Sequence, residues 1–266
     1  MAHDVQTLLK VIIPIYIEKL PAIELHALQN NLRVLADYPI VFIAPETLNT
    51  AWYEEKHLFE NAELLRLTEE WLGQKNGLAG YNRMLMSVDF YKLFDCEYVL
   101  ICQTDAFIFR DDLKQWCANG YDYVGAPWIS SPKYQYPIFK EYLWLRMYFS
   151  KSQVKLTRYH FINRIGNGGL SMRKVSSMIK AAEEYADIAE YYLSKNEKLY
   201  QEDVFWSLVP QWFNYPSIRA ALKFSFDIKP HVCYQLNEDQ LPMGCHGITK
   251  SSYRDFWKPF TGFVED

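Results

Sequence analysis

Short unbroken apolar runs alternate along the first half of this chain with stretches of helical periodicity. Residues 11–15 and 40–45 are runs without polar alternation, the pattern of strands that are buried on both faces of a parallel sheet. Between them, over residues 22–35, leucine and isoleucine recur at helical spacing. Strand, helix and strand in this order predict a right-handed βαβ unit.

A third buried strand is predicted at residues 98–102, after a helix at residues 81–94 and a stretch of turn and mixed helical periodicity at residues 46–74. This strand ends directly at Gln103-Thr104-Asp105. Open α/β sheets bind ligands at the carboxyl ends of their strands, so Asp105 is a candidate to hold a divalent cation that bridges a diphosphate. The alternative is an aspartate that only caps a turn.

The second half has a less regular pattern. Residues 127–163 combine aromatic and basic side chains with little glycine, which predicts an inserted, partly helical segment. Gly166-Asn167-Gly168-Gly169 follows, and residues 170–173 are predicted to lead into a helix that ends near residue 182. The glycines indicate a backbone that approaches a ligand closely or takes a positive φ, or else a plain turn. The pattern is neither a P-loop nor a dinucleotide-binding fingerprint.

Two later groups of polar residues could carry chemistry. Glu202 and Asp203 open a predicted helix, where acids often serve only as caps, but a carboxylate there could also deprotonate an acceptor hydroxyl. His246 lies between Gly244 and Gly247 in a predicted loop, and the tail around it shows no strand–helix alternation. Its imidazole could complete a metal site or touch a phosphate, or it could be an ordinary solvent residue.

Composition limits the class of protein. With 266 residues, half of them hydrophobic, we expect one domain over residues 1–266. A net charge of -4 argues against a nucleic-acid partner. The five cysteines show no paired spacing, which indicates reduced thiols, and the first apolar run is too short for a signal peptide. The protein is therefore expected in the cytoplasm.

Several of these segments together have a familiar arrangement. Gln-x-Asp-Ala-Phe at 103–107, Gly-Asn-Gly-Gly at 166–169, Glu-Asp-x-Phe at 202–205 and Gly-Cys-His-Gly at 244–247 resemble an uncharacterised bacterial family of the glycosyltransferase-A (GT-A) superfamily. The likeness runs over residues 10–260. It implies an α/β fold related to the Rossmann fold, with a mostly parallel central sheet flanked by helices.

The resemblance also implies an activity. Such enzymes move a sugar from a nucleotide sugar, most often a UDP-sugar, to a carbohydrate or lipid-linked acceptor, here in bacterial surface polysaccharide synthesis at the inner face of the membrane. The site residues that it implies are Pro14, Tyr16, Pro45 and Glu46 around the nucleoside, Gln103 and Asp105 at the diphosphate, Gly168, Gly169 and Ser171 at the donor sugar or acceptor, Asp203 as the base of an inverting transfer, Glu202 at the acceptor, and His246 with Asp105 as metal ligands.

One departure from the family pattern concerns the metal. The usual Asp-x-Asp motif reads Gln103-Thr104-Asp105 here, and an amide binds Mn²⁺ or Mg²⁺ more weakly than a carboxylate does. Either Asp105, His246 and the donor diphosphate suffice for a divalent cation, or basic side chains such as Lys75 or Arg83 offset the phosphate charge without one.

Three further readings follow from these residues. The missing acid favours a non-catalytic nucleotide-sugar or carbohydrate binding module on the same fold, whereas the acid pair and His246 favour an enzyme. A nucleotidyltransferase would need a basic, glycine-rich loop after the first strand, which this chain lacks. The basic aromatic residues at 133–155 indicate the acceptor side and a peripheral contact with an anionic membrane, or a solvated helix that packs its aromatic rings inward.

Overall fold

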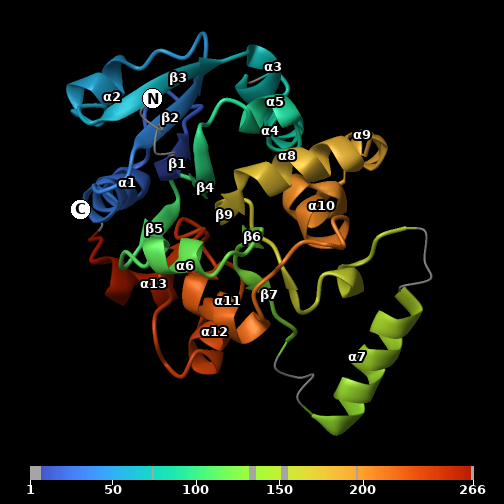
Figure 1. Ribbon diagram of the computed structural model, residues 1–266. Coiled ribbons are helices and arrows are strands. Elements are labelled where there is room, and N and C mark those ends of the chain that lie inside the picture. The colour runs from blue at the N-terminus through green and yellow to red at the C-terminus, as the bar shows by residue number, and fades with distance from the viewer. Residues whose placement is uncertain (1–6, 74, 132–135, 151–154, 196, 265–266) are drawn as a thin grey trace.

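The central feature of the fold is a six-stranded sheet in the order β3-β2-β1-β4-β9-β6 (Figure 1). The computed structural model describes residues 7–73, 75–131, 136–150, 155–195 and 197–264. Strands β1 to β4 are mutually parallel, while β9 runs antiparallel to both β4 and β6. A mostly parallel central sheet flanked by helices, as predicted, is confirmed.

The strands are β1 (Thr7–Pro14), β2 (Ile40–Pro45), β3 (Ala62–Leu67), β4 (Cys96–Cys102), β5 (Ala106–Ile108), β6 (Tyr123–Val124), β7 (Pro127–Trp128), β8 (Arg164–Ile165), β9 (Leu170–Lys174), β10 (Ser225–Phe226) and β11 (Gly244–His246). The helices are α1 (Ala22–Val34), α2 (Ala51–Glu55), α3 (Glu69–Leu72), α4 (Gly77–Leu85), α5 (Val88–Tyr91), α6 (Leu113–Ala118), α7 (Pro137–Ser150), α8 (Val175–Glu184), α9 (Ala186–Leu193), α10 (Glu202–Leu208), α11 (Ile218–Phe224), α12 (Pro230–Leu236) and α13 (Arg254–Thr261). Two 3-10 turns, η2 (Arg158–His160) and η3 (Lys198–Tyr200), complete the set.

Helices cover both faces of the central sheet because its strands are apolar on both sides. Along β1, Ile12 packs into a core formed with α4, α5, α8, α9 and α10, whereas Val11 and Ile13 pack into a core formed with α1, α2 and α6 (Figure 1). The unbroken apolar runs of β1, β2 and β4 are therefore those of buried parallel strands, as predicted. Since these strands are parallel, their carboxyl ends meet at one edge of the sheet.

A smaller sheet lies beyond that edge. Strand β11 pairs parallel with β10 and antiparallel with β5, and a third apolar core packs around this sheet with α12 and α13. The predictions of a loop at residues 244–247 and of a tail without strand–helix alternation are wrong. Strands β10 and β11 are too short to show a hydrophobic period of their own, and pairing with β5 supplies their hydrogen bonds.

Three other local predictions also need correction. Residues 62–67, expected to be turn or helix, form the edge strand β3, which is only partly buried and so lacks an unbroken apolar run. Residues 170–174 form strand β9, which the sequence pattern does not predict, and the predicted helix follows it as α8. The predicted helix at residues 81–94 divides into α4 and α5, because the Ser87 hydroxyl accepts the Phe90 N–H and starts a new helix there.

The inserted segment carries α7, which projects from the body of the molecule (Figure 1). The described part of residues 127–163 is thus partly helical, as predicted, while residues 132–135 and 151–154 lie outside the described residues. Among the described helices, none combines the length and apolar character needed to cross a membrane.

A buried ion pair joins the sheet to helix α10. Arg173 on β9 is completely buried, and its Nη2 donates to Glu202 Oε1 at 3.1 Å. Its Nη1 lies 3.1 Å from Glu202 Oε2, without the alignment of a hydrogen bond, and donates to the Tyr91 hydroxyl at 2.9 Å. The guanidinium Nε donates to Ser171 Oγ at 3.0 Å. The first turn of α10 is therefore held against the sheet by charge as well as by the apolar packing of Val204 and Phe205.

Replacing Arg173 by Met should strongly destabilise the fold, because it leaves the Glu202 carboxylate buried without its cation. We expect a loss of about 3–5 kcal/mol in the free energy of unfolding, measured by urea denaturation. The double variant Arg173→Met/Glu202→Leu should recover most of this loss. Arg83→Met is the matched control, because Arg83 pairs with Glu190 at the exposed surface. This change should lower the free energy of unfolding by less than about 1 kcal/mol. Equal effects of the two arginine substitutions would contradict this account.

Candidate active site

The turn after β4 brings three polar side chains to the carboxyl edge of the sheet. The Gln103 N–H donates to the Gly169 carbonyl at 2.9 Å, and the Thr104 hydroxyl donates to Glu24 Oε2 at 2.5 Å. The Asp105 carbonyl accepts the Gly247 N–H at 3.0 Å, which ties this turn to the segment after β11. Residues far apart in the sequence thus meet at the place where Asp105 was predicted.

His246 lies at the centre of a charged cluster. Its Nε2 is 3.1 Å from Asp105 Oδ1 and 3.1 Å from Gln103 Oε1, and its Nδ1 is 3.2 Å from Asp227 Oδ1. Burial by itself lowers the pKa of His246, but the carboxylates of Asp105 and Asp227 outweigh it and raise this pKa to about 9. Asp105 and His246, proposed from the sequence to act together, are direct neighbours.

Asp227 and Lys250 belong to this cluster and were not found from the sequence. Lys250 Nζ donates to Asp227 Oδ1 at 2.6 Å. Despite burial, the hydrogen bonds and charges of His246 and Lys250 lower the pKa of Asp227 to about 2. Asp227 directly follows β10, and the parallel pairing of β10 with β11 sets it beside His246. The signal for this contact is a pairing of two-residue strands, which no local pattern reveals.

The glycine loop separates this cluster from the acid pair on α10. A Cβ on Gly169 would lie 2.2 Å from His246 Nε2, and one on Gly168 would lie 2.0 Å from Glu202 Oε1. Asn167, not a glycine, takes the positive φ of 73°. Both positions therefore require glycine. The groups that approach them closely are side chains of the site and not, as predicted, a ligand.

Asp203, unlike Glu202, lines a cavity. Its side chain is half-buried, and the Val204 N–H donates to its Oδ1 at 2.8 Å. Burial, together with the charges of Glu202 and Asp227, raises the pKa of Asp203 to about 7. Burial and the charge of Asp227, which bonds to His246, also raise the pKa of Asp105, although His246 and Lys250 lower that pKa overall.

Two of the predicted ligand contacts do not fit this geometry. The Glu202 carboxylate is buried against Arg173 and is not among the residues that line the cavity beside Asp203, so the predicted acceptor contact is not supported. Ser171 is completely buried in β9 with its hydroxyl bonded to Arg173, so it does not reach a donor sugar. A strand position, which the sequence reading missed, explains the burial of Ser171.

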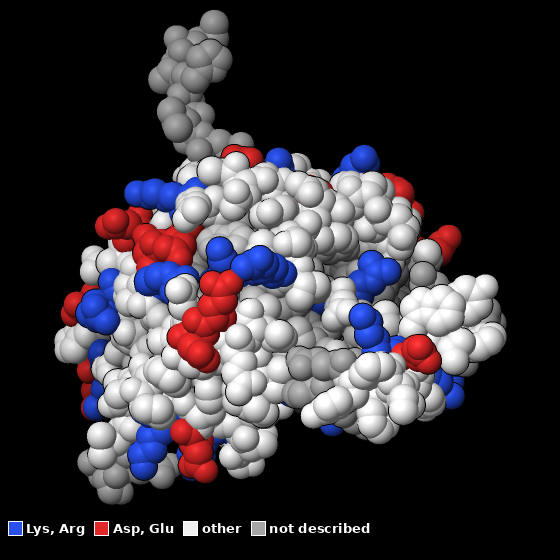
Figure 2. Space-filling model, turned by 90° about the horizontal axis from the view of Figure 1, so that it is seen from below, with Lys and Arg blue, Asp and Glu red and all other residues white. Residues whose placement is uncertain are grey.

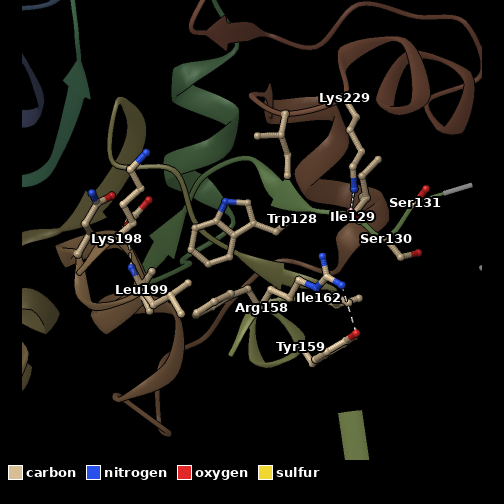
Figure 3. Close-up of a pocket in the computed structure, with 15 residues that line it drawn as sticks. Trp128, Ile129, Ser130, Ser131, Arg158, Tyr159, Ile162, Lys198, Leu199 and Lys229 are labelled. Carbon is tan, nitrogen blue, oxygen red and sulfur yellow. Dashed lines mark hydrogen bonds between the residues drawn. The ribbon is translucent and has the colours of Figure 1, made fainter. Parts of the chain in front are cut away.

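The cavity beside Asp203 has a volume of about 530 Å³ (Figure 3). It is lined by Trp128, Ile129, Ser130, Ser131, Arg158, Tyr159, Phe161, Ile162, Lys198, Leu199, Gln201, Asp203, Val204, Ile228 and Lys229. Figure 3 shows the Trp128 ring in the middle of the residues that line the cavity, with Lys229 and Arg158 on one side of it and Lys198 on the other. Lys229 Nζ donates to the Ile129 carbonyl at 2.8 Å. We call this space the Asp203 cavity.

A second cavity of about 310 Å³ lies next to Gln103. It is lined by Tyr16, Leu72, Gly73, Gly77, Leu78, Tyr81 and Gln103. The Gln103 side chain spans its end, because its Nε2 donates to the Tyr81 hydroxyl at 3.1 Å while its Oε1 faces His246. We call this space the Tyr16 cavity.

Tyr16, predicted at the nucleoside, and Gln103, predicted at the diphosphate, both line the Tyr16 cavity, and about half of the surface of Tyr16 is exposed (48%). Pro14 and Pro45 are buried at the ends of β1 and β2, and Glu46 is exposed after β2; none of these three lines the cavity. Of the two cations proposed for a metal-independent site, Arg83 is engaged by Glu190 and Lys75 is exposed.

Sequence comparison gives the family directly. Residues 61–246, more than half of the chain, match the family described as "Protein of unknown function (DUF5672)". The chain belongs to the DUF5672 family. A search of curated proteins gave no match.

Solved structures similar to this DUF5672 chain are glycosyltransferases. Galactosyltransferase LgtC, solved with donor and acceptor sugar analogues, has a TM-score of 0.54 at 11% identity over 97% of this chain and 98% of that chain. Core-mannan synthase A from Aspergillus fumigatus, in its Mn/GDP form, has a TM-score of 0.50 at 12% identity over 78% and 70%. Glycosyltransferase GlyE from Streptococcus pneumoniae has a TM-score of 0.50 at 11% identity over 97% and 61%. The DUF5672 chain has the GT-A fold.

The donor atoms around His246 fit a divalent cation. Gln103 Oε1 and Asp105 Oδ1 each lie 3.1 Å from His246 Nε2, close to the edge of about 3 Å in an octahedron with Mg²⁺–oxygen bonds of about 2.1 Å. Asp227 on the other ring nitrogen is the usual second partner of a metal-bound histidine. No cluster of three His, Cys, Asp or Glu side chains suited to a metal occurs in the described ranges, and one of the donors here is an amide. Gln103 Oε1, Asp105 Oδ1 and His246 Nε2 face one another with their lone pairs, so either a proton or a metal cation has to lie between them.

Replacing Gln103 by Asp should tighten the binding of Mn²⁺ alone by at least about tenfold, because a second carboxylate adds negative charge to the donor set. Electron paramagnetic resonance of free Mn²⁺ measures the dissociation constant. Gln115→Asp is the control, since Gln115 is exposed on α6 and its change should leave the affinity unaltered. An unchanged affinity for Gln103→Asp would place the cation elsewhere.

Replacing Asp203 by Asn should stabilise the DUF5672 protein in a pH-dependent way. The pKa of this carboxyl rises from an ordinary 3.8 to about 7 on folding, so the folded state holds its proton more tightly. The contribution of this carboxyl to the free energy of unfolding of the wild type is therefore greatest below pH 3.8. It falls as the pH rises toward 7 and stays low above that pH. Asn escapes this loss, so the variant should gain roughly 2–4 kcal/mol near pH 8 and little near pH 4.

Thermal unfolding across this pH range measures the difference. Asp37→Asn, at an exposed turn, is the matched control and should show no such growth with pH. A gain that is constant with pH, or absent, would mean that Asp203 is charged in the folded protein at low pH.

Proposed function

We propose that this protein is a glycosyltransferase that moves a sugar from a nucleoside-diphosphate donor to a carbohydrate or lipid-linked acceptor. One observation supports the proposal: Gly168 packs against Glu202 and Asp203, and the next residue, Gly169, packs against His246. A site for a leaving diphosphate and a site for a base then face the same reacting bond. The resemblance of its motifs points to bacterial surface polysaccharide synthesis as the setting.

The donor side is assigned to the Tyr16 cavity and the His246 cluster. The exposed Tyr16 ring and Tyr81 offer flat faces for a nucleobase, and Gln103 joins this cavity to Asp105 and His246 at the diphosphate. Lys250 is a further cation within reach of the phosphates. Core-mannan synthase A was solved with manganese and GDP, and we extend a divalent cation to this site on the donor set described above. UDP is our first choice of nucleotide by resemblance.

The acceptor side is assigned to the Asp203 cavity. Its volume of about 530 Å³ is large enough for a sugar, and its Trp128 wall offers an apolar face to the ring. Three basic residues line it, Arg158, Lys198 and Lys229, against the single acid Asp203. This charge balance favours an acceptor that carries an acidic group, such as a phosphate or a carboxylate.

The reaction is a single in-line displacement. The Asp203 carboxylate takes the proton of the acceptor hydroxyl, whose oxygen attacks the anomeric carbon as the bond from that carbon to the diphosphate breaks. A divalent cation, when bound, would neutralise charge that develops on the leaving diphosphate. A pKa near 7 suits Asp203 to this role, because the group is ionised yet basic at neutral pH. Glu202 acts as a positioning residue through Arg173.

Asp203→Asn should lower kcat for transfer by at least about a thousandfold while leaving the donor dissociation constant within a few-fold, because the base acts only in the chemical step. Thermal-shift screening against nucleoside diphosphates with and without Mn²⁺ first selects the nucleotide. Release of nucleoside diphosphate from the matching nucleotide sugars then measures turnover. The wild-type rate should rise with pH and level off above about 7.

Asp37→Asn controls for the loss of a carboxylate as such and should keep full activity. Full turnover by Asp203→Asn would refute the base, and a product of unchanged anomeric configuration would refute the in-line step. Nucleotide binding with neither transfer nor donor hydrolysis, over a full panel of nucleotide sugars, would identify a binding module instead.

A further inference from the structure

Lys229 is a half-buried cation that lines the Asp203 cavity. Its Nζ donates to the neutral carbonyl of Ile129 at 2.8 Å, and no carboxylate of the described residues pairs with it. Burial lowers the pKa of Lys229, and Cys233 opposes this shift without cancelling it. An ammonium in such a place is stabilised by an anion that enters the cavity.

The backbone of Lys229 is held in an unfavourable conformation. Its φ of 52° and ψ of 52° lie in the left-handed region, and the next residue is Pro230. A Cβ disfavours this region, and a residue before proline prefers an extended backbone. The Lys229 carbonyl accepts the N–H groups of Val232 and Cys233, which holds the turn in place. Glycine would take this conformation at lower cost, so the lysine indicates a use for its side chain.

Two serine hydroxyls lie beside the Lys229 ammonium. Ser130 directly follows Ile129, whose carbonyl Lys229 contacts, and both Ser130 and Ser131 line the cavity. Figure 3 shows these two serines on the same side of the Trp128 ring as Lys229. Among the described residues, neither hydroxyl has a hydrogen-bond partner. Both are therefore available to a ligand.

The surroundings of this cavity are basic. Arg158 and Lys198 line it together with Lys229, whereas Asp203 is the one acid among the lining residues. Arg158 belongs to η2, which packs against α7. Figure 2, which views the molecule from below, shows basic side chains near the inner edge of the lobe at the right, where α7 lies. The charge on this side of the molecule favours the entry of an anion.

The donors favour a phosphoryl group over a carboxylate. After its bond to the Ile129 carbonyl, the Lys229 ammonium has two further protons to donate, and each serine hydroxyl has one. A terminal phosphoryl group offers three acceptor oxygens and close to two negative charges at neutral pH, whereas a carboxylate offers two oxygens and one charge. Trp128, in the middle of the lining residues, presents an apolar face to a sugar ring.

We propose that Lys229, Ser130 and Ser131 bind a phosphoryl group of the acceptor, whose sugar ring lies against Trp128. The acceptor is then a phosphorylated sugar, either free in solution or joined through its phosphate to a lipid. Its role as the acceptor beside Asp203 rests on the proposed function, but the binding of a phosphoryl group at Lys229 does not.

Calorimetric titration of the whole protein with sugar 1-phosphates tests this site without donor or transfer. The probes are the 1-phosphates of glucose, galactose, mannose and N-acetylglucosamine, each compared with its parent sugar. Wild type should bind at least one of them at least about tenfold more tightly than the parent sugar, and less tightly at high salt. Lys229→Met should weaken this binding by at least about tenfold, because it removes the charge, and Lys229→Arg should recover most of the loss.

Two further variants separate binding from folding and from charge in general. Glycine takes the left-handed backbone without strain, so Lys229→Gly should unfold at the temperature of the wild type and still lose the phosphate binding. Lys223→Met removes an exposed lysine of α11 that does not line the cavity, and it should bind like wild type.

Three results would overturn the proposal. They are equal binding of every 1-phosphate and its parent sugar, binding that Lys229→Met and Lys229→Gly leave unchanged, and tighter binding of glucuronic acid than of glucose 1-phosphate, which would assign the site to a carboxylate. Titration with the farnesyl diphosphate ester of the preferred sugar distinguishes the two sources. Tighter binding than that of the 1-phosphate supports the site with a lipid-linked sugar, and equal or weaker binding supports it with a soluble one.

Failure of this inference and failure of the proposed function give different results. Phosphoryl binding that depends on Lys229, with neither sugar transfer nor donor hydrolysis, would contradict the proposed function alone. Sugar transfer at an acceptor KM that Lys229→Met leaves unchanged would contradict the phosphoryl site alone.

Discussion

The ion pair between Arg173 and Glu202 is the constraint on which the site depends. It adds a charged contact to the apolar packing of α10 on the sheet, and a buried guanidinium needs a partner that satisfies its charge. Glu202 therefore has one position, in contact with Gly168. The next residue along the helix, Asp203, is half-buried and lines a cavity. One carboxylate of the pair is structural, and the other lines the cavity where we propose that it acts as the base.

A second constraint acts around His246. Its two ring nitrogens face Asp105 and Gln103 on one side and Asp227 on the other, so this imidazole is held between acceptors in every direction that it can donate. Gly169 has to be a glycine because any side chain would occupy this space. Between these two constraints lie only two residues of loop, Gly168 and Gly169, so in the proposed reaction the diphosphate and the acceptor hydroxyl would lie on the two sides of this loop.

The parts of this arrangement that could be predicted from sequence are those with a local pattern. The buried strands β1, β2 and β4 show as unbroken apolar runs, and the position of Asp105 follows from parallel strands ending at one edge. The edge strand β3 was missed because Glu63 and Arg66 interrupt its apolar residues, and β9 because its glycine loop looked like a turn before a helix. Edge strands and antiparallel strands show a weaker hydrophobic pattern in the sequence than buried parallel strands do.

Long-range contacts were out of reach for a different reason. Asp227 and Lys250 have nothing in their own neighbourhood that points to His246, and two short paired strands alone bring the first of them there. The distinct roles of Glu202 and Asp203 also depend on Arg173, which lies 29 residues away in the chain. The sequence allows both adjacent acids to be assigned to one site. Which of the two lines the cavity depends on which one pairs with Arg173, and only the structure shows that.

A crystal structure of the protein with Mn²⁺ and the nucleoside diphosphate that stabilises it most would test this account most directly. The account predicts the base against Tyr16 and Tyr81 and the diphosphate at Asp105 and His246, with its terminal phosphate facing across Gly168 and Gly169 toward the Asp203 carboxylate. A nucleotide bound anywhere else, or a terminal phosphate turned away from the Asp203 carboxylate, would contradict it.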